Sequence, residues 1–317
     1  MKKNKTTFFM VLFFFIGLIV LLYPSISDYT NSKIQSKAID NYEELVKKID
    51  KVDYDQYLNE ANEYNKALMK ISNPLITYKK LQDASKLLDV NGSGVLGYIS
   101  IDKINVELPI HYGTTESVLA SSVGLLEGSS MPIGKEGTHA VLSAHRGLPS
   151  SKLFTNLDRM EIGDTFVLKV LNKTMTYEID QIRIVEPKEI DQLSINPKQD
   201  YVTIMTCTPY GINTHRLLVR GHRVENAKAK MYVSTGAFKV DKWIITPIVC
   251  LPIIFIWLLL IAFKPMRKNI NTYIEKYVFI NKNKDSKLMR PSNNFEEKEY
   301  QIFDKYVYPS GINIDSY

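Results

Sequence analysis

The chain has 317 residues, of which 45% are hydrophobic and 23% are charged, and its formal net charge is +6. Its lysine and arginine residues flank two apolar segments, which indicates contact with anionic lipid rather than a nucleic-acid-binding face. No stripe of basic and aromatic residues indicates binding to DNA or RNA.

The first apolar segment, residues 7–23, has the sequence TFFMVLFFFIGLIVLLY and follows three lysines. A run of this length is just sufficient to span a bilayer, and preceding basic residues are typical of a retained anchor or of a signal peptide. Ser25 and Ser27 would form only a weak cleavage site. We predict that residues 1–27 form a retained membrane anchor, with a cleaved signal peptide as the alternative.

The second apolar segment, residues 243–263, contains no charged residue. Its length predicts a transmembrane helix rather than a buried core helix, and the basic residues that start at Lys264 predict a cytoplasmic location for the side that follows. The N-terminal lysines agree with this orientation. The sequence therefore predicts a two-pass membrane protein with both termini in the cytoplasm and an extracytoplasmic domain between the spans. Residues 227–242 form a lysine-rich stalk, and 264–317 form a polar cytoplasmic tail.

The extracytoplasmic part divides into a helical region, 28–90, and a β-rich region, 91–226. Apolar residues recur at helical spacing along 31–49 and 54–71, and Pro74 is expected to end the second helix. In the β-rich region, runs of β-branched and aromatic residues alternate with Gly, Pro, Asn and Asp, which predicts an all-β barrel or sandwich. The clearest runs are VLGYISI, HAVLSAH, TFVLKVL, MTYEIDQIRIV, YVTIMTC and RLLVRG.

The two cysteines fall on different sides of this topology. Cys250 lies within the second span and Cys207 lies in the outside domain, so they cannot form a disulfide. If the strands YVTIMTC and THRLLVRGH pair around a turn between Gly211 and Ile212, Cys207 faces Arg216 with their Cβ atoms roughly 5 Å apart. A basic partner would favour the reactive thiolate. On spacing alone, a buried structural thiol and a surface arginine remain the alternative.

Five histidines could supply a base. Strand alternation turns His215 to the opposite face, and His222 lies about 20 Å further along the hairpin. His111 and His139 lie near strand beginnings or loops, without a matching partner. His145 ends an apolar strand and precedes a turn, where a barrel presents side chains at its mouth. The residues alone leave His145 open to a structural and to a catalytic role.

Three segments resemble a known family. TIMTCTPYGINTHRLLVRG resembles the TLxTC signature and following strand of sortases, in the form typical of class C, the pilus-assembling sortases of Gram-positive bacteria. SAHRGLPSSKLFTNLDRMEIGD resembles the catalytic-histidine segment of the same family, and GYISIDKINVELPIHYG resembles its first strands. The resemblance covers residues 91–224 in matching order, and two flanking anchors also suit class C. Ile204 stands where the signature usually has Leu.

The resemblance implies a closed eight-stranded β-barrel with a transpeptidase site. By matching position, Cys207 would attack the Thr–Gly carbonyl of an LPxTG-like sorting signal, and Arg216 would hold the substrate and stabilise the oxyanion. His145 would protonate the leaving amine and later deprotonate the incoming amine, a pilin lysine. The chemistry requires no cofactor and no metal.

One feature departs from the class C pattern. These enzymes generally carry a lid before the barrel, with an Asp-Pro-aromatic motif that covers the cleft. No such triplet occurs between Ile34 and Gly97, and residues 73–85 occupy the expected place with Tyr78 as the only aromatic residue. We therefore expect a segment with few apolar contacts that leaves Cys207 accessible to small thiol reagents.

Other functions are compatible with parts of the sequence. A sortase could attach surface proteins to a cell-wall peptide amine instead of a pilin lysine, and a thiol protease would use water in place of the amine. A non-catalytic membrane scaffold with an inert thiol is the alternative from a different class. The complete set of His145, Cys207 and Arg216 favours an enzyme.

Overall fold

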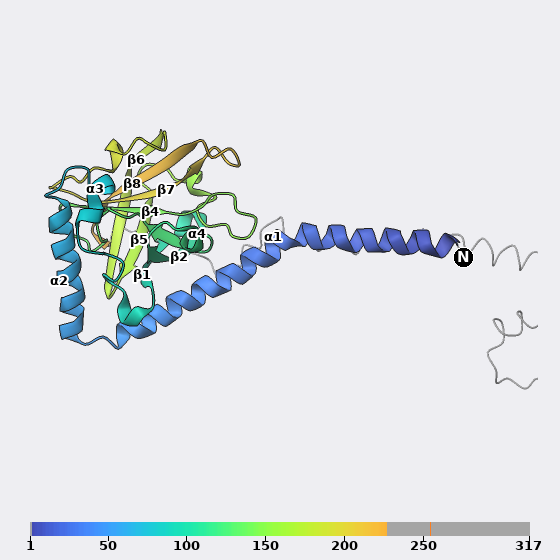
Figure 1. Ribbon diagram of the computed structural model, residues 1–317, viewed down its shortest axis with the longest axis horizontal. Helices are drawn as coiled ribbons and strands as arrows, with labels where there is room; N and C mark the ends of the chain where they lie inside the picture. Colours follow the sequence, from blue (N-terminus) through green and yellow to red (C-terminus); the bar gives the residue numbers. More distant parts are fainter. Residues whose placement is uncertain (1, 227–253, 255–317) are drawn as a thin grey trace, which may run out of the picture. The chain divides into compact units, whose positions relative to one another are not determined.

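Eight β-strands close into a barrel in this computed structural model, which describes residues 2–226 and residue 254 (Figure 1). The strand order is β1-β2-β3-β4-β7-β8-β6-β5, and β5 pairs back with β1. The closed eight-stranded barrel that the resemblance implied is confirmed, and each of the six predicted runs forms a strand. The strands are β1 (Val95–Ile101), β2 (Val106–Tyr112), β3 (Val123–Leu125), β4 (Thr138–Ser143), β5 (Thr165–Val170), β6 (Lys173–Val185), β7 (Asp200–Thr208) and β8 (His215–Val224).

Side chains fill the inside of the barrel. Alternate residues of each strand point inward, which is why the strand sequences alternate between large apolar and more polar residues. Phe166 and Tyr177 stack inside with their ring centroids 5.5 Å apart, and both are buried. Gly221 of β8 leaves room for them, because a Cβ atom there would stand 2.7 Å from the Phe166 ring. The interior is therefore a packed core rather than a channel, and chemistry must take place on the outer face or at the rim.

The helical region differs in detail from the sequence prediction. The first helix is continuous from residue 2 to 47, through Pro24, so the predicted boundary at residue 27 is not a break. The second helix ends at Leu68, before the predicted stop. Pro74 begins a short helix instead of ending one, because proline suits the first helical position, where its missing N–H is not needed. The helices are α1 (Lys2–Lys47), α2 (Lys51–Leu68), α3 (Pro74–Thr77) and α4 (Glu116–Leu119), with short 3-10 helices η1 (Tyr78–Lys80), η2 (Val90–Gly92), η3 (Asp102–Ile104), η4 (Leu157–Arg159) and η5 (Asp191–Leu193).

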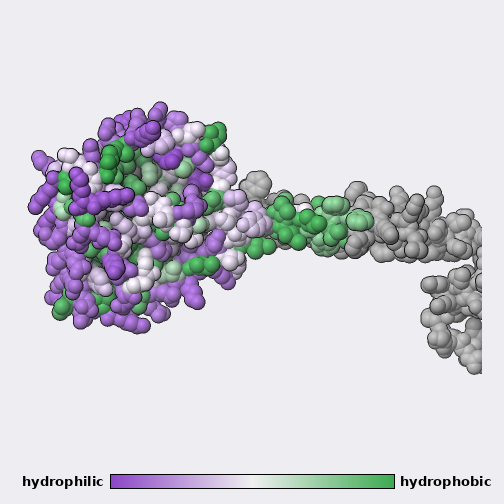
Figure 2. Space-filling model, in the orientation of Figure 1, coloured by the Kyte–Doolittle hydropathy of each residue, from purple (hydrophilic) through white to green (hydrophobic). Residues whose placement is uncertain are grey.

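The N-terminal part of α1 is an exposed apolar helix. By length and composition it could cross a membrane, as an anchor or as a signal sequence, and it is the one such helix among the described residues. Figure 2 shows apolar surface along this part of α1 and mainly hydrophilic surface over the barrel. The predicted second span, 243–263, the stalk, 227–242, and the tail, 264–317, lie outside the residues that can be described, apart from the single residue 254.

The C-terminal half of α1 and the whole of α2 belong to the barrel domain. Tyr42 of α1 is buried, and its hydroxyl donates to the Leu96 carbonyl at 3.0 Å and accepts from the Leu171 amide at 2.7 Å. Asn65 of α2 exchanges two hydrogen bonds with the main chain of Met131, at 2.9 and 2.7 Å. Because buried polar groups are costly when unpaired, these contacts fix both helices in one arrangement on the barrel.

Candidate active site

Cys207 and Arg216 face each other across β7 and β8. The two strands are antiparallel, and their register pairs Cys207 directly with Arg216, as the hairpin geometry of the sequence predicts. The turn between them is closed by the amides of Ile212 and Asn213, which both donate to the Pro209 carbonyl. Cys207 is partly exposed and is a free thiol. The thiol and a fixed positive charge are therefore neighbours on an accessible surface.

The guanidinium of Arg216 is oriented by the loop before it. Its Nη1 atom donates to the carbonyls of Asn213 and His215, at 3.3 and 3.1 Å. Within residues 2–226, its Nε and Nη2 atoms have no hydrogen-bond partner. An arginine held from one side in this way keeps two donors for an oxygen of a bound substrate.

His145 follows the end of β4, the parallel neighbour of β7 on the side away from β8. The last pair of the β4–β7 ladder is Ser143 with Met205, and the Ala144 amide continues it by donating to the Met205 carbonyl at 3.2 Å. The same offset, continued by one more residue, places His145 beside Cys207 on one face of the sheet. From this register we expect the thiol to lie between the imidazole and the guanidinium. The catalytic roles of the three side chains stay a prediction.

A carboxylate accompanies His145. Oε2 of Glu116, at the start of α4, lies 3.5 Å from Nε2 of the imidazole, and that nitrogen is buried without a hydrogen-bond partner in the described chain. The contact becomes an ion pair when the ring is protonated, which is the form that a general acid needs. The sequence analysis did not single out Glu116, because α4 reaches the site from a distant part of the chain.

An open pocket of about 220 Å³ begins next to Arg216. It lies on the outer face of β6, β7 and β8, and the loop between β6 and β7 forms one wall. Its floor is apolar, and three glutamates lie among its lining residues. The lining residues are Leu75, Leu126, Glu127, Val185, Glu186, Pro187, Glu189, Ile190, Leu193, Met205, Arg216 and Leu218. A peptide bound here would place apolar side chains in the pocket and its next residues towards Cys207.

The segment 73–85 is better packed than its sequence suggests. Leu75 lies against the buried apolar cluster beneath the pocket, Leu81 packs against the main core, and Ala84 is buried in it, so the expectation of few apolar contacts is wrong. The ring of Tyr78 lies so close to Gly128 that a Cβ atom there would stand 3.0 Å from it. Leu75 also lines the pocket that begins next to Arg216. The accessibility of the thiol to small reagents stays a prediction.

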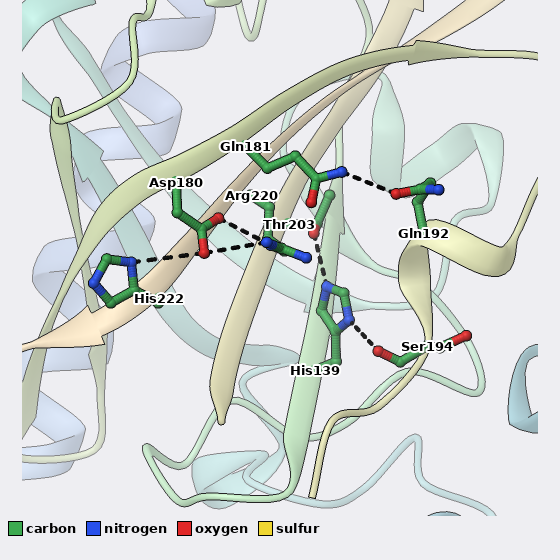
Figure 3. Close-up of polar contacts among 8 residues, drawn as sticks. All are labelled: His139, Asp180, Gln181, Gln192, Ser194, Thr203, Arg220 and His222. Carbon is green, nitrogen blue, oxygen red and sulfur yellow. Dashed lines mark hydrogen bonds and ion pairs between the residues drawn. The ribbon is translucent and has the colours of Figure 1, made fainter. Parts of the chain in front are cut away.

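His139 attaches the β6–β7 loop to the sheet, and Figure 3 shows this arrangement. Its Nδ1 atom lies 2.9 Å from the Ser194 carbonyl, and its Nε2 atom lies 2.7 Å from the Thr203 hydroxyl. A carbonyl can only accept, so Nδ1 carries the proton and Nε2 accepts from Thr203. Burial lowers the pKa of His139 to about 4 and keeps the ring neutral. A second contact, from Gln181 to Gln192 at 2.9 Å, attaches the same loop to β6. The sequence analysis found no partner for His139; the structure supplies two.

Two further basic side chains, Arg220 and His222, lie beside Asp180 and away from the thiol. Arg220 lies opposite Thr203, makes two hydrogen bonds to Asp180 at 2.9 and 3.2 Å, and stacks on Tyr201. His222 pairs with Tyr201 in the ladder and lies 3.7 Å from Asp180. Both residues therefore belong to a separate group, as the strand geometry predicts (Figure 3). Within residues 2–226, no group of three or more His, Cys, Asp or Glu side chains could hold a metal ion.

A closed eight-stranded barrel with a free thiol opposite an arginine near the ends of two adjacent strands is an arrangement that suits a cysteine-dependent acyl-transfer enzyme. The model of the family described as "Sortase domain" matches residues 99–224. Sortase C1 of Streptococcus agalactiae is 47% identical, covers 60% of this chain and 99% of its own, and has a TM-score of 0.56. The chain therefore belongs to the sortase family, whose members are cysteine transpeptidases.

Further solved structures agree with this assignment. Clostridium perfringens sortase C, solved with the C-terminal cell wall sorting motif, is 44% identical over 60% of this chain and 99% of its own, with a TM-score of 0.52. Sortase C of Streptococcus pneumoniae, described for its catalysis and pilin substrate specificity, is 41% identical over 60% of this chain and 97% of its own, with a TM-score of 0.54. All three are class C sortases. Sortase D of Bacillus subtilis is 31% identical over 131 residues, and the match covers 40% of this chain and 63% of that protein.

Proposed function

We propose that this protein is a membrane-anchored transpeptidase that cleaves an LPxTG-like sorting signal between Thr and Gly and transfers the product to a pilin lysine amine. The pairing of Cys207 with Arg216 carries the proposal, because it places a nucleophile next to a fixed cation. The pilin assignment is supported by the class C neighbours, one solved with a sorting motif and one described for pilin specificity.

The first half-reaction forms a thioester. The thiolate of Cys207 attacks the Thr carbonyl carbon, and the carbonyl oxygen becomes an oxyanion. Nε and Nη2 of Arg216, which have no hydrogen-bond partner within residues 2–226, would bind this oxygen, and such pre-oriented charge is among the largest contributions to acyl-transfer catalysis. The C–N bond to Gly then breaks, and His145 supplies the proton that the leaving amine takes.

The second half-reaction reverses these roles. The incoming lysine amine attacks the thioester carbonyl in its neutral form, and His145, now neutral, takes the proton that the amine nitrogen loses as the amide forms. The C–S bond breaks, Cys207 returns as the thiolate, and an isopeptide bond remains. Dividing one amide exchange into two steps through the thioester lowers the barrier to each. A cell-wall peptide amine could enter the same second step, and the acceptor is the point on which the two sortase functions differ.

The membrane topology proposed with this function has both termini in the cytoplasm and the barrel outside. α1 would supply one span and residues 243–263 the other, and lysines beside both spans would contact lipid headgroups. A sortase in this position meets secreted substrates as they leave the membrane.

The test uses the full-length protein in detergent with a peptide that contains LPxTG and with a lysine-bearing pilin-type peptide or a cell-wall peptide as acceptor. We expect a transfer product, identified by mass spectrometry, that depends on Cys207 and is formed preferentially with the pilin-type lysine. Cleavage without transfer to either amine would indicate a protease, and no cleavage with peptides of varied sorting sequence would refute the proposed function.

A further inference from the structure

The residues that follow the proposed nucleophile and the proposed acid are joined to each other. Arg146 follows His145, and Thr208 follows Cys207. Nη1 of Arg146 donates to the Thr208 hydroxyl at 3.1 Å. Its Nη2 atom donates to Asp158 at 2.7 Å, and the arginine side chain is only 8% exposed.

This contact matters because main-chain pairing ends just before the site. The last β4–β7 pair is Ser143 with Met205, and β4 ends at Ser143. Beyond it, a single main-chain hydrogen bond, from Ala144 to Met205, joins the two strands. His145 therefore has no ladder partner of its own to set its distance from Cys207.

Two side-chain contacts on the buried side of the sheet replace the missing ladder. The Thr206 hydroxyl donates to the Ala144 carbonyl at 2.8 Å, which fixes the residues just before the pair. The bond from Arg146 to Thr208 fixes the residues just after it. Thr206 and Thr208 are both buried, and they alternate with Cys207 along β7. Side-chain hydrogen bonds on the opposite face of the sheet therefore join the two strands both before and after His145 and Cys207.

The loops that continue from the two strands are also in contact. The Tyr210 ring covers Gly147, where an added Cβ atom would stand 2.8 Å from the ring. The Arg146 guanidinium lies over the same ring at 6.0 Å from its centroid. Gly147 donates its amide to the Thr155 hydroxyl at 3.1 Å, which closes the loop after His145. Arg146 therefore contacts three segments: the end of β7 through Thr208, the turn after β7 through Tyr210, and the segment after His145 through Asp158.

We infer that Arg146 is a positioning residue that acts through Thr208 to hold His145 at a fixed separation from Cys207. The inference rests on the proposed function, because it assigns the pair its chemistry. A charge-assisted hydrogen bond in a mostly buried site is stronger and more directional than a neutral one at the surface. Small displacements of reacting groups lower rates by large factors, so the loss of this tie reduces turnover more than it reduces peptide binding.

The test compares Thr208→Val, Arg146→Gln and the double variant in the full-length protein. Thr208→Val is decisive, because it removes the hydrogen bond while leaving both the shape of the side chain and the Arg146 charge in place. The matched control is Thr176→Val in β6, which also removes a buried hydroxyl and its hydrogen bond, to Asn226, near the other end of β8. Any general cost of this type of substitution appears in the control.

Two measurements are made on each variant. Turnover of an LPxTG-containing peptide should fall about tenfold in kcat with KM unchanged in both single variants, and the double variant should be no worse than the poorer single one. The second measurement is the rate of alkylation of Cys207 by iodoacetamide as a function of pH, with Cys207 resolved from Cys250 by peptide mass spectrometry. The midpoint of this pH profile should lie at higher pH in Thr208→Val than in wild type, because His145 is no longer held at a fixed distance from the thiolate.

The outcomes separate the two claims. If Thr208→Val matches Thr176→Val in kcat and in the alkylation midpoint, Arg146 is structural only and the inference is overturned. If the wild type makes no product from any sorting peptide, the proposed function fails, while the alkylation midpoints still decide whether Arg146 sets the environment of the thiol. If Thr208→Val does not fold, Arg146→Gln and Asp158→Asn are compared in the same two assays. The first removes the guanidinium that binds Thr208, and the second weakens the bond from Asp158 that holds this guanidinium.

Discussion

The contact of His139 with the β6–β7 loop predicts a variant that weakens substrate binding without changing the chemical step. In His139→Phe, the ring and its edge contact with Tyr201 are kept, and the two hydrogen bonds are lost. The loop carries several of the pocket-lining residues, so loosening it should raise KM for a sorting peptide and leave kcat unchanged.

The expected magnitude follows from the two partners of the ring. The Thr203 hydroxyl is buried on β7, so losing its acceptor costs about 1–3 kcal/mol in overall stability whether the loop is closed or open. The Ser194 side lies in an exposed part of the loop, where water can replace the histidine, so the closed loop loses only about 1 kcal/mol. That is about a fivefold increase in loop opening, and we expect KM to rise by up to about fivefold.

Hydrogen exchange of the full-length protein, followed by mass spectrometry of peptides covering residues 190–196, measures loop opening directly. The matched control is Thr203→Val, which leaves the bond from His139 to Ser194 in place. It should be destabilised globally without faster exchange in the loop and without a change in KM. Equal exchange in His139→Phe and wild type, or equally fast exchange in both variants, would refute the reasoning.

Three further predictions concern the site, the topology and the pH dependence of stability. His145→Ala should lose at least about 100-fold in transpeptidation, whereas His215→Ala and His222→Ala should keep most activity, because strand geometry places both away from the thiol; peptide turnover checks all three, and substantial activity in the first would remove it from the mechanism. Protease added to wall-stripped cells should digest residues 28–242 and spare a C-terminal tag; loss of the tag would contradict a cytoplasmic C-terminus. Burial raises the pKa of Asp200 from 3.8 to about 6, so its stabilising contribution is complete below pH 3.8 and is lost as the pH rises through 6. The free energy of unfolding of Asp200→Asn, measured by urea titration, should therefore depend less on pH between about 4 and 7, by about 2–3 kcal/mol, and an unchanged profile would count against the buried charge.

The sequence predicts the part of the site that depends on one local turn. Cys207 and Arg216 belong to consecutive strands, so the turn between them determines their register, and strand alternation separates them from His215. His145 could not be placed in the same way. β4 and β7 are parallel and more than 50 residues apart in the chain, so their pairing is a property of the closed barrel. The family resemblance supplied what periodicity could not.

Other features depend on contacts that no local pattern encodes. Proline is common both just after a helix ends and at the first position of a helix, so the sequence does not decide which of these Pro74 occupies. In the structure it begins α3. Leu75 is one of several apolar residues in the segment 73–85, and only the barrel surface beneath it decides that it is packed. His139 has partners in the β6–β7 loop and on β7, and Arg146 has its partner at the end of β7, so both depend on segments that only the closed barrel brings together. A histidine inside an apolar strand is the one signal that could have prompted a search, because a buried imidazole needs partners for both nitrogens.

The central claim is that Cys207 forms a thioester with the sorting signal, and the most direct measurement is the mass of the acyl-enzyme. Full-length protein is mixed with an LPxTG-containing peptide without an amine acceptor, quenched in acid, and digested for peptide mass spectrometry. We expect the peptide up to its Thr to be attached to Cys207, to be released by hydroxylamine, and to be absent in Cys207→Ala. An adduct on Cys250 instead, or peptide cleavage that persists in Cys207→Ala, would contradict the account.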